Sequence, residues 1–545
     1  MTLFEQILTA RGLTTRAARQ AFLQPDYMAV KHDPFLLPDM KKAVARLKQA
    51  REQGEKIVIY GDYDIDGLSA TALLLDAFGK FGFEDVDAFI PNRFVEGYGM
   101  TMGAVDKVRD MGADLIVTVD TGSLCHTEIA YAASLGIDTV VTDHHNVAET
   151  PPPSVAAVNP KFPGHTYPFR DLCGAGVAFK LVQALQTELD GLPDGYEKWL
   201  LDLVALGTVC DIVTLADENR ANVYWGLEVL KKQQRPGLKA LMAVAGIEPE
   251  QVNARHLGFG LGPRMNAAGR LETAQHALDM LVAHDGLAAL EASEKLEELN
   301  VKRRDIQDAI FEEACVQAEK LANDRVLVVS SDGWNHGVIG IVASKLVEKY
   351  KKPVFIIGER GEEATGSARS FGDFSAADAV RAADDIIIKG GGHGAAAGVT
   401  LATGKIGDFR RRVNEFYDSL QLTNQERYLL PRADVEIGDF SEIDEELVAN
   451  LAKMEPFGNG NPEPVLKITR ASVLSMRRMG ADGQHVKLAL RDKNGKVLQM
   501  LAFNAPEEFF REPGDEVSVW FQSTVNEWQG VRTVEGRLLH IILLD

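Results

Sequence analysis

Short apolar runs alternate with amphipathic stretches in the first half of the chain. Runs at 57–60, 115–119 and 139–142 are bounded by glycine or polar residues, which predicts buried strands. The stretches between these runs carry apolar residues at helical spacing. Strands that alternate with helices in this way predict βαβ units and a mainly parallel sheet. We therefore expect residues 41–271 to form an α/β domain.

The patterns on either side of this domain predict additional parts. Residues 1–40 contain two short helical patterns and a proline-bearing stretch, and we expect them to pack on the α/β domain. Residues 272–325 are helical in pattern throughout and contain no proline, which predicts a helix that connects two domains. Residues 326–425 predict a second α/β unit, with strands at 326–329, 354–357 and 363–369.

Residues 426–545 differ in character, because short strand-like runs with tight turns replace the helical patterns. Five such runs, with a hairpin turn at 492–495, favour an OB-type β-barrel, a common single-strand-binding fold. An SH3-like barrel and a small sandwich are the alternatives. The aromatic residues Trp520, Phe521 and Trp528 either stack on bases or belong to the core. We thus expect two α/β domains and a C-terminal barrel.

The composition is that of a soluble globular protein, with 46% hydrophobic and 25% charged residues. A length of 545 residues exceeds the size of one hydrophobic core, which agrees with several domains. The four cysteines form no CxxC pair, which argues against a zinc ribbon or a disulfide framework and fits a reducing cytoplasm. Because the N-terminus has no signal-peptide pattern and no apolar run has the length of a membrane span, we expect a cytoplasmic protein.

The net charge of −21 argues against a protein that binds nucleic acid through bulk positive charge. It does not argue against binding in a locally basic groove. Basic clusters do occur, for example at 302–304 and 410–412, but each of them alone is more typical of a solvated helix face.

Acidic residues follow each of the three predicted strands of the first domain. Asp62, Asp64 and Asp66 come after the first strand, and Asp120 and Asp143 come after the second and third. Because the carboxyl ends of parallel strands form the ligand-binding edge of an α/β sheet, we expect these carboxylates to meet there. One such motif could be an acidic turn open to water. Three strands that end in the same way favour a cation site, since buried anions need a counter-charge.

Two histidines and a fourth acidic motif extend this set. His144 and His145 follow Asp143, and Asp211 follows an apolar helical stretch. A lone histidine is more often a core residue, but beside an acid-tipped strand His144 is better interpreted as a ligand. A mixed set of oxygen and nitrogen ligands suits Mn²⁺ or Mg²⁺. Two such ions can activate a water and stabilise an in-line displacement at phosphorus, so phosphoester or phosphoanhydride hydrolysis is the leading prediction.

A glycine-rich stretch, GGGHGAAAG, lies at residues 390–398. It lacks the residue order of a phosphate-binding P-loop. Its small residues suit either a close approach of the backbone to a ligand or a tight helix-packing cluster, and the sequence leaves both open.

Four short motifs resemble those of the DHH phosphoesterase superfamily. They are GDYDIDG at 61–67, VDTG at 119–122, TDHH at 142–145 and GTVCD at 207–211. Within this superfamily the chain resembles, nearly end to end, the bacterial RecJ family of single-strand-specific 5′→3′ DNA exonucleases. The motifs that carry this closer resemblance are LGPRMNAAGRL at 261–271, WNHGVIG at 334–340 and EPFGNGNP at 455–462.

The resemblance implies roles for individual residues. The family's metal ligands match Asp62, Asp64, Asp66, Asp120, His144 and Asp211, and His145 matches a second active-site histidine. The family's substrate-binding positions match Arg93 near the bound 5′ end, Arg264, Asn266 and Arg270 in the linking motif, and Ser367, Arg369, Gly391, Gly392 and His393 in the second domain. One departure is Thr214, where the family usually has proline, and it puts the shape of the loop after Asp211 in question.

The resemblance also implies an activity and partners. It predicts a DHH and a DHHA1 domain, two Mn²⁺ or Mg²⁺ ions, and release of 5′ mononucleotides from single-stranded DNA in repair and recombination. The implied partners are single-strand-binding protein and a RecQ-type helicase, with no membrane, and we expect a monomer. Two other functions compete with this prediction. A hydrolase of pyrophosphate or very short oligonucleotides needs only the two α/β units, and an inactive scaffold would have lost acids that this chain retains.

Overall fold

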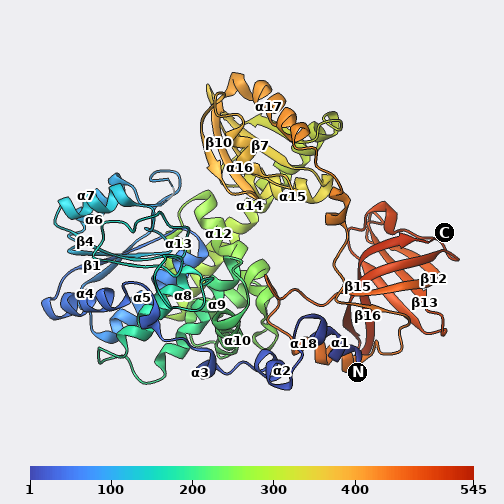
Figure 1. Ribbon diagram of the computed structural model, residues 1–545, viewed down its shortest axis with the longest axis horizontal. Helices are drawn as coiled ribbons and strands as arrows, with labels where there is room; N and C mark the ends of the chain where they lie inside the picture. The colour runs from blue at the N-terminus through green and yellow to red at the C-terminus, as the bar shows by residue number, and fades with distance from the viewer. Residues whose placement is uncertain (98, 545) are drawn as a thin grey trace.

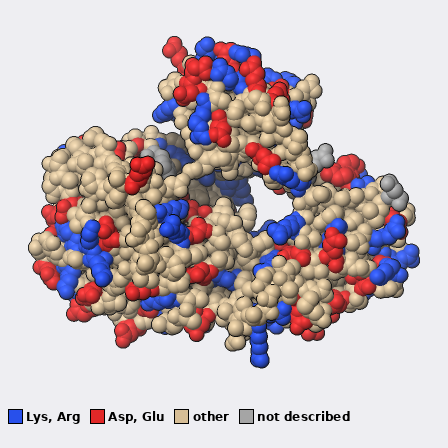
Figure 2. Space-filling model, in the orientation of Figure 1, with Lys and Arg blue, Asp and Glu red and all other residues tan. Residues whose placement is uncertain are grey.

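The computed structural model describes residues 1–97 and 99–544, and its three β-sheets belong to three domains arranged around a central opening (Figure 1). Figure 2 shows this opening between the domains. Both chain ends lie beside the C-terminal sheet (Figure 1). Among the described residues, no helix combines the length and the apolar character needed to cross a membrane. The predicted α/β class with two α/β domains is confirmed.

The first domain is a three-layer arrangement around a parallel sheet. In the spatial order β2-β1-β3-β4-β5, its strands are β1 (Ile57–Gly61), β2 (Val86–Phe89), β3 (Leu115–Val119), β4 (Asp138–Thr142) and β5 (Ala156–Val158). The three strands predicted from apolar runs are present, and the structure adds β2 and β5 at the edges. The sequence did not reveal these two because β2 is only half-buried and β5 has three residues.

Helices cover both faces of this sheet. One face carries α4 (Met40–Gln53), α5 (Ile65–Phe81) and α8 (Gly174–Leu185), and the other carries α6 (Met102–Asp110) and α7 (His126–Ser134). Further helices pack outside α5 and α8, so that these two helices are buried along most of their length: α9 (Leu201–Cys210), α10 (Asp217–Lys231), α11 (Pro236–Val244) and α12 (Gly262–Leu271). The amino ends of α5 and α8 therefore reach the edge of the sheet in a dry environment.

The connection to the second domain consists of two helices. The predicted single helix over 272–325 is interrupted after α13 (Gln275–Val282), and α14 (Gly286–Lys320) begins where the Asp285 side chain accepts from the backbone N–H groups of Leu287 and Ala288. The first part of α14 contributes to the core of the first domain, and its last part contributes to the core of the second. This helix thus links the two α/β cores directly.

The second domain contains a mixed sheet in the order β6-β7-β8-β10-β9. Its elements are β6 (Leu327–Asp332), α15 (Ile339–Tyr350), β7 (Val354–Arg360), β8 (Glu363–Arg369), α16 (Ala376–Arg381), β9 (Ile387–Gly392), β10 (Ala396–Ala402) and α17 (Ile406–Ser419). The glycine-rich stretch forms the β9–β10 hairpin rather than a helix-packing cluster. The sequence did not predict these two strands because glycine and alanine are weak strand formers.

The C-terminal domain is a closed barrel. Its elements are β11 (Val435–Ile437), α18 (Glu445–Ala452), β12 (Leu466–Met479), β13 (His485–Arg491), β14 (Val497–Ala502), β15 (Glu516–Trp528) and β16 (Val531–Leu543). The strand order β12-β13-β14-β16-β15 returns to β12 through a β12–β15 pairing, and β14 and β16 are parallel. The predicted OB-type barrel is confirmed. Trp520 and Phe521 are buried in it, as the core interpretation predicts, while the side chain of Trp528 lies outside the described residues.

The N-terminal segment divides between two domains. Helix α1 (Leu3–Ala10) buries Leu3 and Ile7 in the core of the C-terminal domain, and Arg11 pairs with Asp434 there at 2.8 Å. After α2 (Arg16–Leu23), α3 (Tyr27–Val30) and residues 35–37 join the core of the first domain. The expectation that residues 1–40 pack on the first α/β domain is therefore wrong for α1. The sequence pattern of α1 predicts that its apolar face is buried, but it does not indicate which domain buries it.

Candidate metal centre and arginine cluster

The predicted metal ligands meet at the carboxyl edge of the first sheet because neighbouring strands end in register. Gly61 is paired with Val119, and Val119 with Thr142. The next residue of each strand continues the hydrogen-bonding pattern, since Asp62 N–H donates to Val119 O and Asp120 N–H donates to Thr142 O at 3.1 Å. Asp120 also adopts a left-handed backbone with φ of 61°, which is uncommon for a residue with a side chain.

The amino ends of two helices complete the site. Asp64 caps α5, where its carboxylate accepts from Asp66 N–H at 2.9 Å. The Asp66 carboxylate in turn accepts from Ala175 N–H at 2.8 Å at the start of α8. Two glycines permit this packing, since a Cβ on Gly174 would lie 2.7 Å from Asp120 Oδ1 and one on Gly207 would lie 2.4 Å from Asp66 Oδ1. These contacts fix the carboxylates in place.

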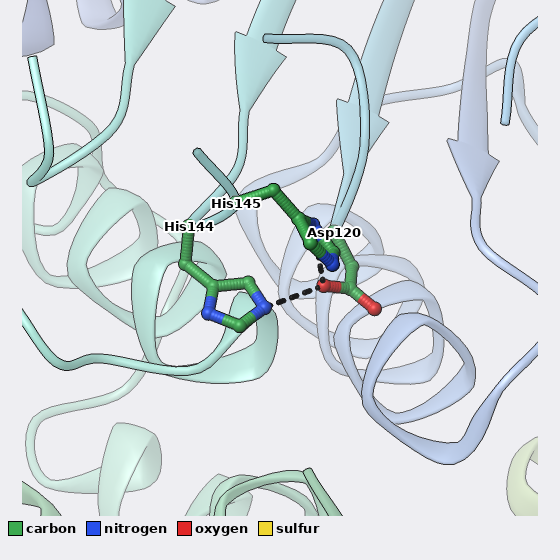
Figure 3. A group of neighbouring side chains, drawn as sticks. All are labelled: Asp120, His144 and His145. Carbon is green, nitrogen blue, oxygen red and sulfur yellow. Dashed lines mark ion pairs between the residues drawn. The ribbon is translucent and has the colours of Figure 1, made fainter. Parts of the chain in front are cut away.

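His144 lies among the carboxylates, and Figure 3 shows its ring and that of His145 directed at the Asp120 carboxylate. The Nε2 of His144 is 3.0 Å from Asp120 Oδ1, 3.5 Å from Asp211 Oδ2 and 3.7 Å from Asp66 Oδ2. Asp62, Asp64 and Asp120 offer a second group of oxygens within 4.8 Å of one another. All six residues predicted as metal ligands are thus brought together in overlapping groups.

His145 is oriented by Asp143, which the strand pattern grouped with the cation site but which the family resemblance did not match to a metal ligand. The Asp143 carboxylate lies 2.9 Å from His145 Nδ1 and accepts from the backbone N–H groups of Ser123 and His144. Burial alone would lower the pKa of His145, but the bond to Asp143 outweighs it and raises the pKa to about 9. The same partners hold the pKa of Asp143 below its usual range. Asp143 is therefore an orienting residue with a satisfied carboxylate.

The donor set fits divalent cations. Asp62 Oδ1, Asp120 Oδ1 and His144 Nε2 are buried and have no hydrogen-bond partner in the structure. Burial and neighbouring carboxylates raise the pKa of Asp62 to about 7 and that of Asp211 to about 8, and they raise the pKa of Asp120 well above its usual value. Burial lowers the pKa of His144 to about 4, which keeps the imidazole neutral as a metal ligand must be. Buried carboxylates without counter-charge and a neutral imidazole are what hard cations require.

Four arginines, Arg93, Arg270, Arg303 and Arg369, form an arginine cluster between the first and second domains. Burial and then the charges of the other three lower the pKa of Arg270 to about 10, so the other three guanidinium groups lie close enough to act on its charge. Among the described residues, none of the four forms an ion pair with a carboxylate, and each bonds to neutral groups. Arginines that are partly withdrawn from water and have no carboxylate partner need an anionic ligand to balance their charge.

Arg93 connects this cluster to the metal centre. Its Nη2 donates to Tyr63 Oη at 2.9 Å and its guanidinium lies 4.6 Å from the centre of the Tyr63 ring. Tyr63 stands between two of the acidic residues in sequence. Glu96, which could have paired with Arg93, instead pairs with Lys107. Arg93 is thus placed beside the carboxylates and remains without a carboxylate of its own.

The second domain contributes residues from β8 and its neighbours. Arg369 Nη1 donates to Ser367 Oγ at 3.1 Å. Ser367 is paired with Gly398 and Gly398 with Gly391, so Ser367 and the glycine hairpin share one stretch of the sheet. Gly391, Gly392 and His393 are exposed.

Two predicted residues of the linking motif differ in their surroundings. Arg264 Nε pairs with Glu297 and its Nη1 donates to Gly260 O, so its charge is neutralised within the protein. Asn266 lines a cavity of about 850 Å³, the central cavity, together with Arg270 and Arg303. Sequence reasoning missed Arg303, since the cluster 302–304 was interpreted as a solvated helix face. Asn300 and Gln307, which bind Arg303 from one turn away on either side, mark the buried face of α14.

A loop of the C-terminal domain holds the loop that follows Asp211. Asn459 Nδ2 donates to Ile212 O at 2.8 Å, and Leu215 N–H donates to Asn459 O at 2.8 Å. Thr214, the departure from the family pattern, uses its N–H to donate to Asp171 at 2.9 Å, a bond that proline could not make. The loop is therefore well fixed despite the substitution.

Comparisons with known proteins agree with this architecture. Family models described as the DHH family N-terminal domain, the DHHA1 domain and the RecJ OB domain match residues 56–208, 323–419 and 433–540. The chain is 39% identical to the single-stranded-DNA-specific exonuclease RecJ of Bacillus subtilis, over 96% of this chain but 66% of that protein. It is 34% identical to the corresponding RecJ of Salmonella typhimurium, over 92% of this chain and 89% of that protein.

Solved structures give the same result. RecJ from Thermus thermophilus in complex with Mn²⁺ matches with a TM-score of 0.83 at 30% identity, over 99% of this chain and 76% of that one. Its complex with Mg²⁺ matches with a TM-score of 0.77 at 28% identity, over 98% of this chain and 74% of that one. With three domain matches in order, relatives above 30% identity and this structural agreement, the chain belongs to the RecJ family of DHH phosphoesterases.

Proposed function

We propose that this chain is a divalent-metal-dependent exonuclease that hydrolyses single-stranded DNA from the 5′ end, releases 5′ mononucleotides and acts in repair and recombination. One observation carries the proposal: a buried carboxylate–histidine centre lies beside a partly buried arginine cluster, and Arg93 joins them. Divalent cations would neutralise the carboxylates, and a phosphate would neutralise the arginines. The relatives named as single-stranded-DNA-specific exonucleases support the substrate class.

The residues of the metal centre would have distinct tasks. Those that would hold the ions are Asp62, Asp64, Asp66, Asp120, His144 and Asp211. Two divalent cations bound there, Mn²⁺ or Mg²⁺, would supply an activated water and charge stabilisation for an in-line displacement at phosphorus. His145 has its Nδ1 committed to Asp143, so the Nε2–H of the protonated ring is the donor left for a phosphate oxygen.

The arginine cluster would set the polarity of cutting. A terminal 5′-phosphate is dianionic near neutral pH and offers three acceptor oxygens, which suit planar guanidinium donors. Arg93, beside the metal centre, and the Ser367–Arg369 pair across from it are the proposed receptors. Gly391, Gly392, His393, Asn266 and Arg270 would contact the strand beyond its first phosphate. Because Arg264 is neutralised by Glu297, it would support α12 rather than bind the phosphate.

The remaining assignments follow from this activity. We propose residues 41–271 as the DHH catalytic domain, 272–325 as the connecting helical segment, 326–425 as the DHHA1 substrate-binding domain and 426–545 as the OB domain that grips the strand. The protein would act as a monomer in the cytoplasm, and single-strand-binding protein and a RecQ-type helicase would be its partners. The unpaired cysteines support a reducing compartment.

The test is degradation of labelled single-stranded DNA, duplex DNA, a dinucleotide and pyrophosphate, each with Mn²⁺ and after chelation. We expect the single strand alone to be degraded rapidly, and only with metal. Preferred hydrolysis of pyrophosphate or the dinucleotide would instead identify another DHH hydrolase. Binding of single strands without hydrolysis of any substrate would identify an inactive scaffold.

A further inference from the structure

An exposed phenylalanine lies on the wall of the central cavity. Phe259 is 79% exposed, although phenylalanine is usually among the most buried residue types. It belongs to the π-helical turn His256–Leu261, in which Leu257 and Leu261 are fully buried. The turn is therefore anchored in the core while Phe259 points away from it. π-helical turns are rare and occur frequently at functional sites.

A second apolar side chain is exposed in the same cavity. Ile212 is 69% exposed and has a φ of 59°, a left-handed conformation that is strained for a β-branched residue. The bond from Asn459 to its carbonyl helps to hold this conformation. Ile212 directly follows Asp211, so it lies at the metal end of the cavity.

Part of the cavity wall is suited to phosphates, while Glu455 and Glu463 also line it and Glu463 pairs with Arg537. Arg270 and Arg303 of the arginine cluster line it, and the Arg255 guanidinium lies 5.7 Å from the centre of the Phe259 ring. A surface that combines exposed aromatic and aliphatic side chains with arginines lacking carboxylate partners is complementary to a single nucleic-acid strand. Its bases would contact the apolar groups and its phosphates the guanidinium groups.

We propose that Phe259 is a base-stacking residue for the strand entering the metal centre, and that Ile212 makes apolar contact with the base nearest the metals. The inference rests on the proposed function and adds to it a base-contacting site in the first domain. The ligand of this site is a nucleobase of any type, because every base offers a π face. Stacking would hold the strand between successive cuts without selecting a sequence.

The test uses the full chain in chelator, so that strands bind without being cut. Each 5′-phosphorylated strand carries either one 2-aminopurine or one abasic residue at a position scanned over the first eight nucleotides. We expect wild type to quench 2-aminopurine fluorescence at one or two positions and to lose affinity about tenfold when the base there is abasic. Phe259→Ala should lose both effects, and Phe259→Trp should retain them.

Trp199→Ala is the matched control, since Trp199 is 41% exposed but does not line the central cavity. It should behave as wild type. The inference is overturned if quenching and the preference for intact over abasic strands persist in Phe259→Ala. It is also overturned if Phe259→Ala loses affinity equally for intact and abasic strands, because that result would indicate a contact to the strand's backbone. If wild type cuts single strands and Phe259→Ala still distinguishes intact from abasic strands as wild type does, only this inference is refuted. A wild type that neither binds nor cuts them refutes the proposed function as well.

Discussion

The metal centre is a buried group of like charges and the arginine cluster is a partly buried one, and both contrast with buried charges elsewhere in the molecule. Lys180 and Glu218 are at most 5% exposed, and they pair with each other. Asp66 and Asp120 are 1% exposed beside other carboxylates, and Arg303 is 8% exposed beside other arginines. The pKa shifts run toward the neutral form in both clusters, upward for the carboxylates and downward for Arg270.

This difference separates charges that stabilise the fold from charges that bind a ligand. A buried pair satisfies itself, whereas a buried cluster of one sign is destabilising until an ion of opposite sign arrives. The fold holds both clusters rigidly through helix ends and strand register, so the unfavourable charge is retained. The ligands inferred from the two clusters, divalent cations and a phosphate, are the cofactor and the substrate group of metal-dependent phosphodiester hydrolysis.

The largest expected effect comes from removing one carboxylate. Asp120→Asn should reduce hydrolysis more than about 100-fold, since even groups one shell outside a metal's ligands contribute 10–100-fold. The metal-free protein should lose no stability, because one of several repelling charges is gone. Asp418→Asn, on the exposed face of α17, is the control. The measurement is the steady-state rate of hydrolysis at saturating Mn²⁺. A turnover of Asp120→Asn within about tenfold of wild type would exclude Asp120 from the metal centre.

Metal addition should stabilise the folded protein. At a Mn²⁺ concentration about 100 times its dissociation constant, mass action adds about 2.7 kcal/mol to the free energy of unfolding. Thermal unfolding with and without Mn²⁺ measures this gain, and Asp120→Asn should show much less of it. An equal gain in both proteins would mean that the ion binds elsewhere.

An intermediate effect is expected in the arginine cluster. Arg369→Ala or Arg93→Ala should weaken cutting of 5′-phosphorylated strands more than of 5′-hydroxyl strands, by about 1.5–3 kcal/mol for a lost charged hydrogen bond. Arg411→Ala is the control, since Arg411 lies on the exposed side of α17 and pairs with Asp408 and Glu415. Equal losses of kcat/KM on both substrates would show that these arginines hold the strand generally.

The smallest expected effect tests the link from the C-terminal domain. Asn459→Ala removes one neutral hydrogen bond to Ile212, worth about 1 kcal/mol. Because Ile212 adjoins Asp211, Mn²⁺ affinity should fall modestly, and affinity for single strands should fall by less than in Phe259→Ala. Titration of Mn²⁺ by electron paramagnetic resonance measures the first quantity and fluorescence anisotropy the second. Loss of strand affinity alone would contradict the positioning role.

Much of the metal centre could be predicted because its ligands follow strands that are evident from local pattern. Apolar runs of similar length ended in Asp62, Asp120 and Asp143, and parallel pairing alone brings such ends together. The different roles of these three carboxylates could not be predicted. Asp143 differs from Asp120 only through its contacts to His145 and Ser123, which depend on the folded loop.

The arginine cluster was harder to predict because it is assembled from distant segments. Arg93, Arg270, Arg303 and Arg369 belong to a loop, two helices and a strand, and no spacing rule connects them. The resemblance to the family named three of the four but not Arg303. Similarly, the apolar face of α1 predicted burial and could not specify the domain that buries it. Local pattern determines elements, whereas contacts between domains depend on complementarity that is distributed over the chain.

The most direct test of the whole account is a time course on one 5′-phosphorylated single strand labelled at its 5′ end or, in a second preparation, at its 3′ end. With Mn²⁺, the 5′ label should appear at once as a mononucleotide, while the 3′ label should remain on strands that shorten progressively. Chelation should stop both reactions. Early release of the 3′ label, or hydrolysis that continues in chelator, would contradict the proposal that hydrolysis occurs at the carboxylate centre next to a 5′-phosphate held by the arginine cluster.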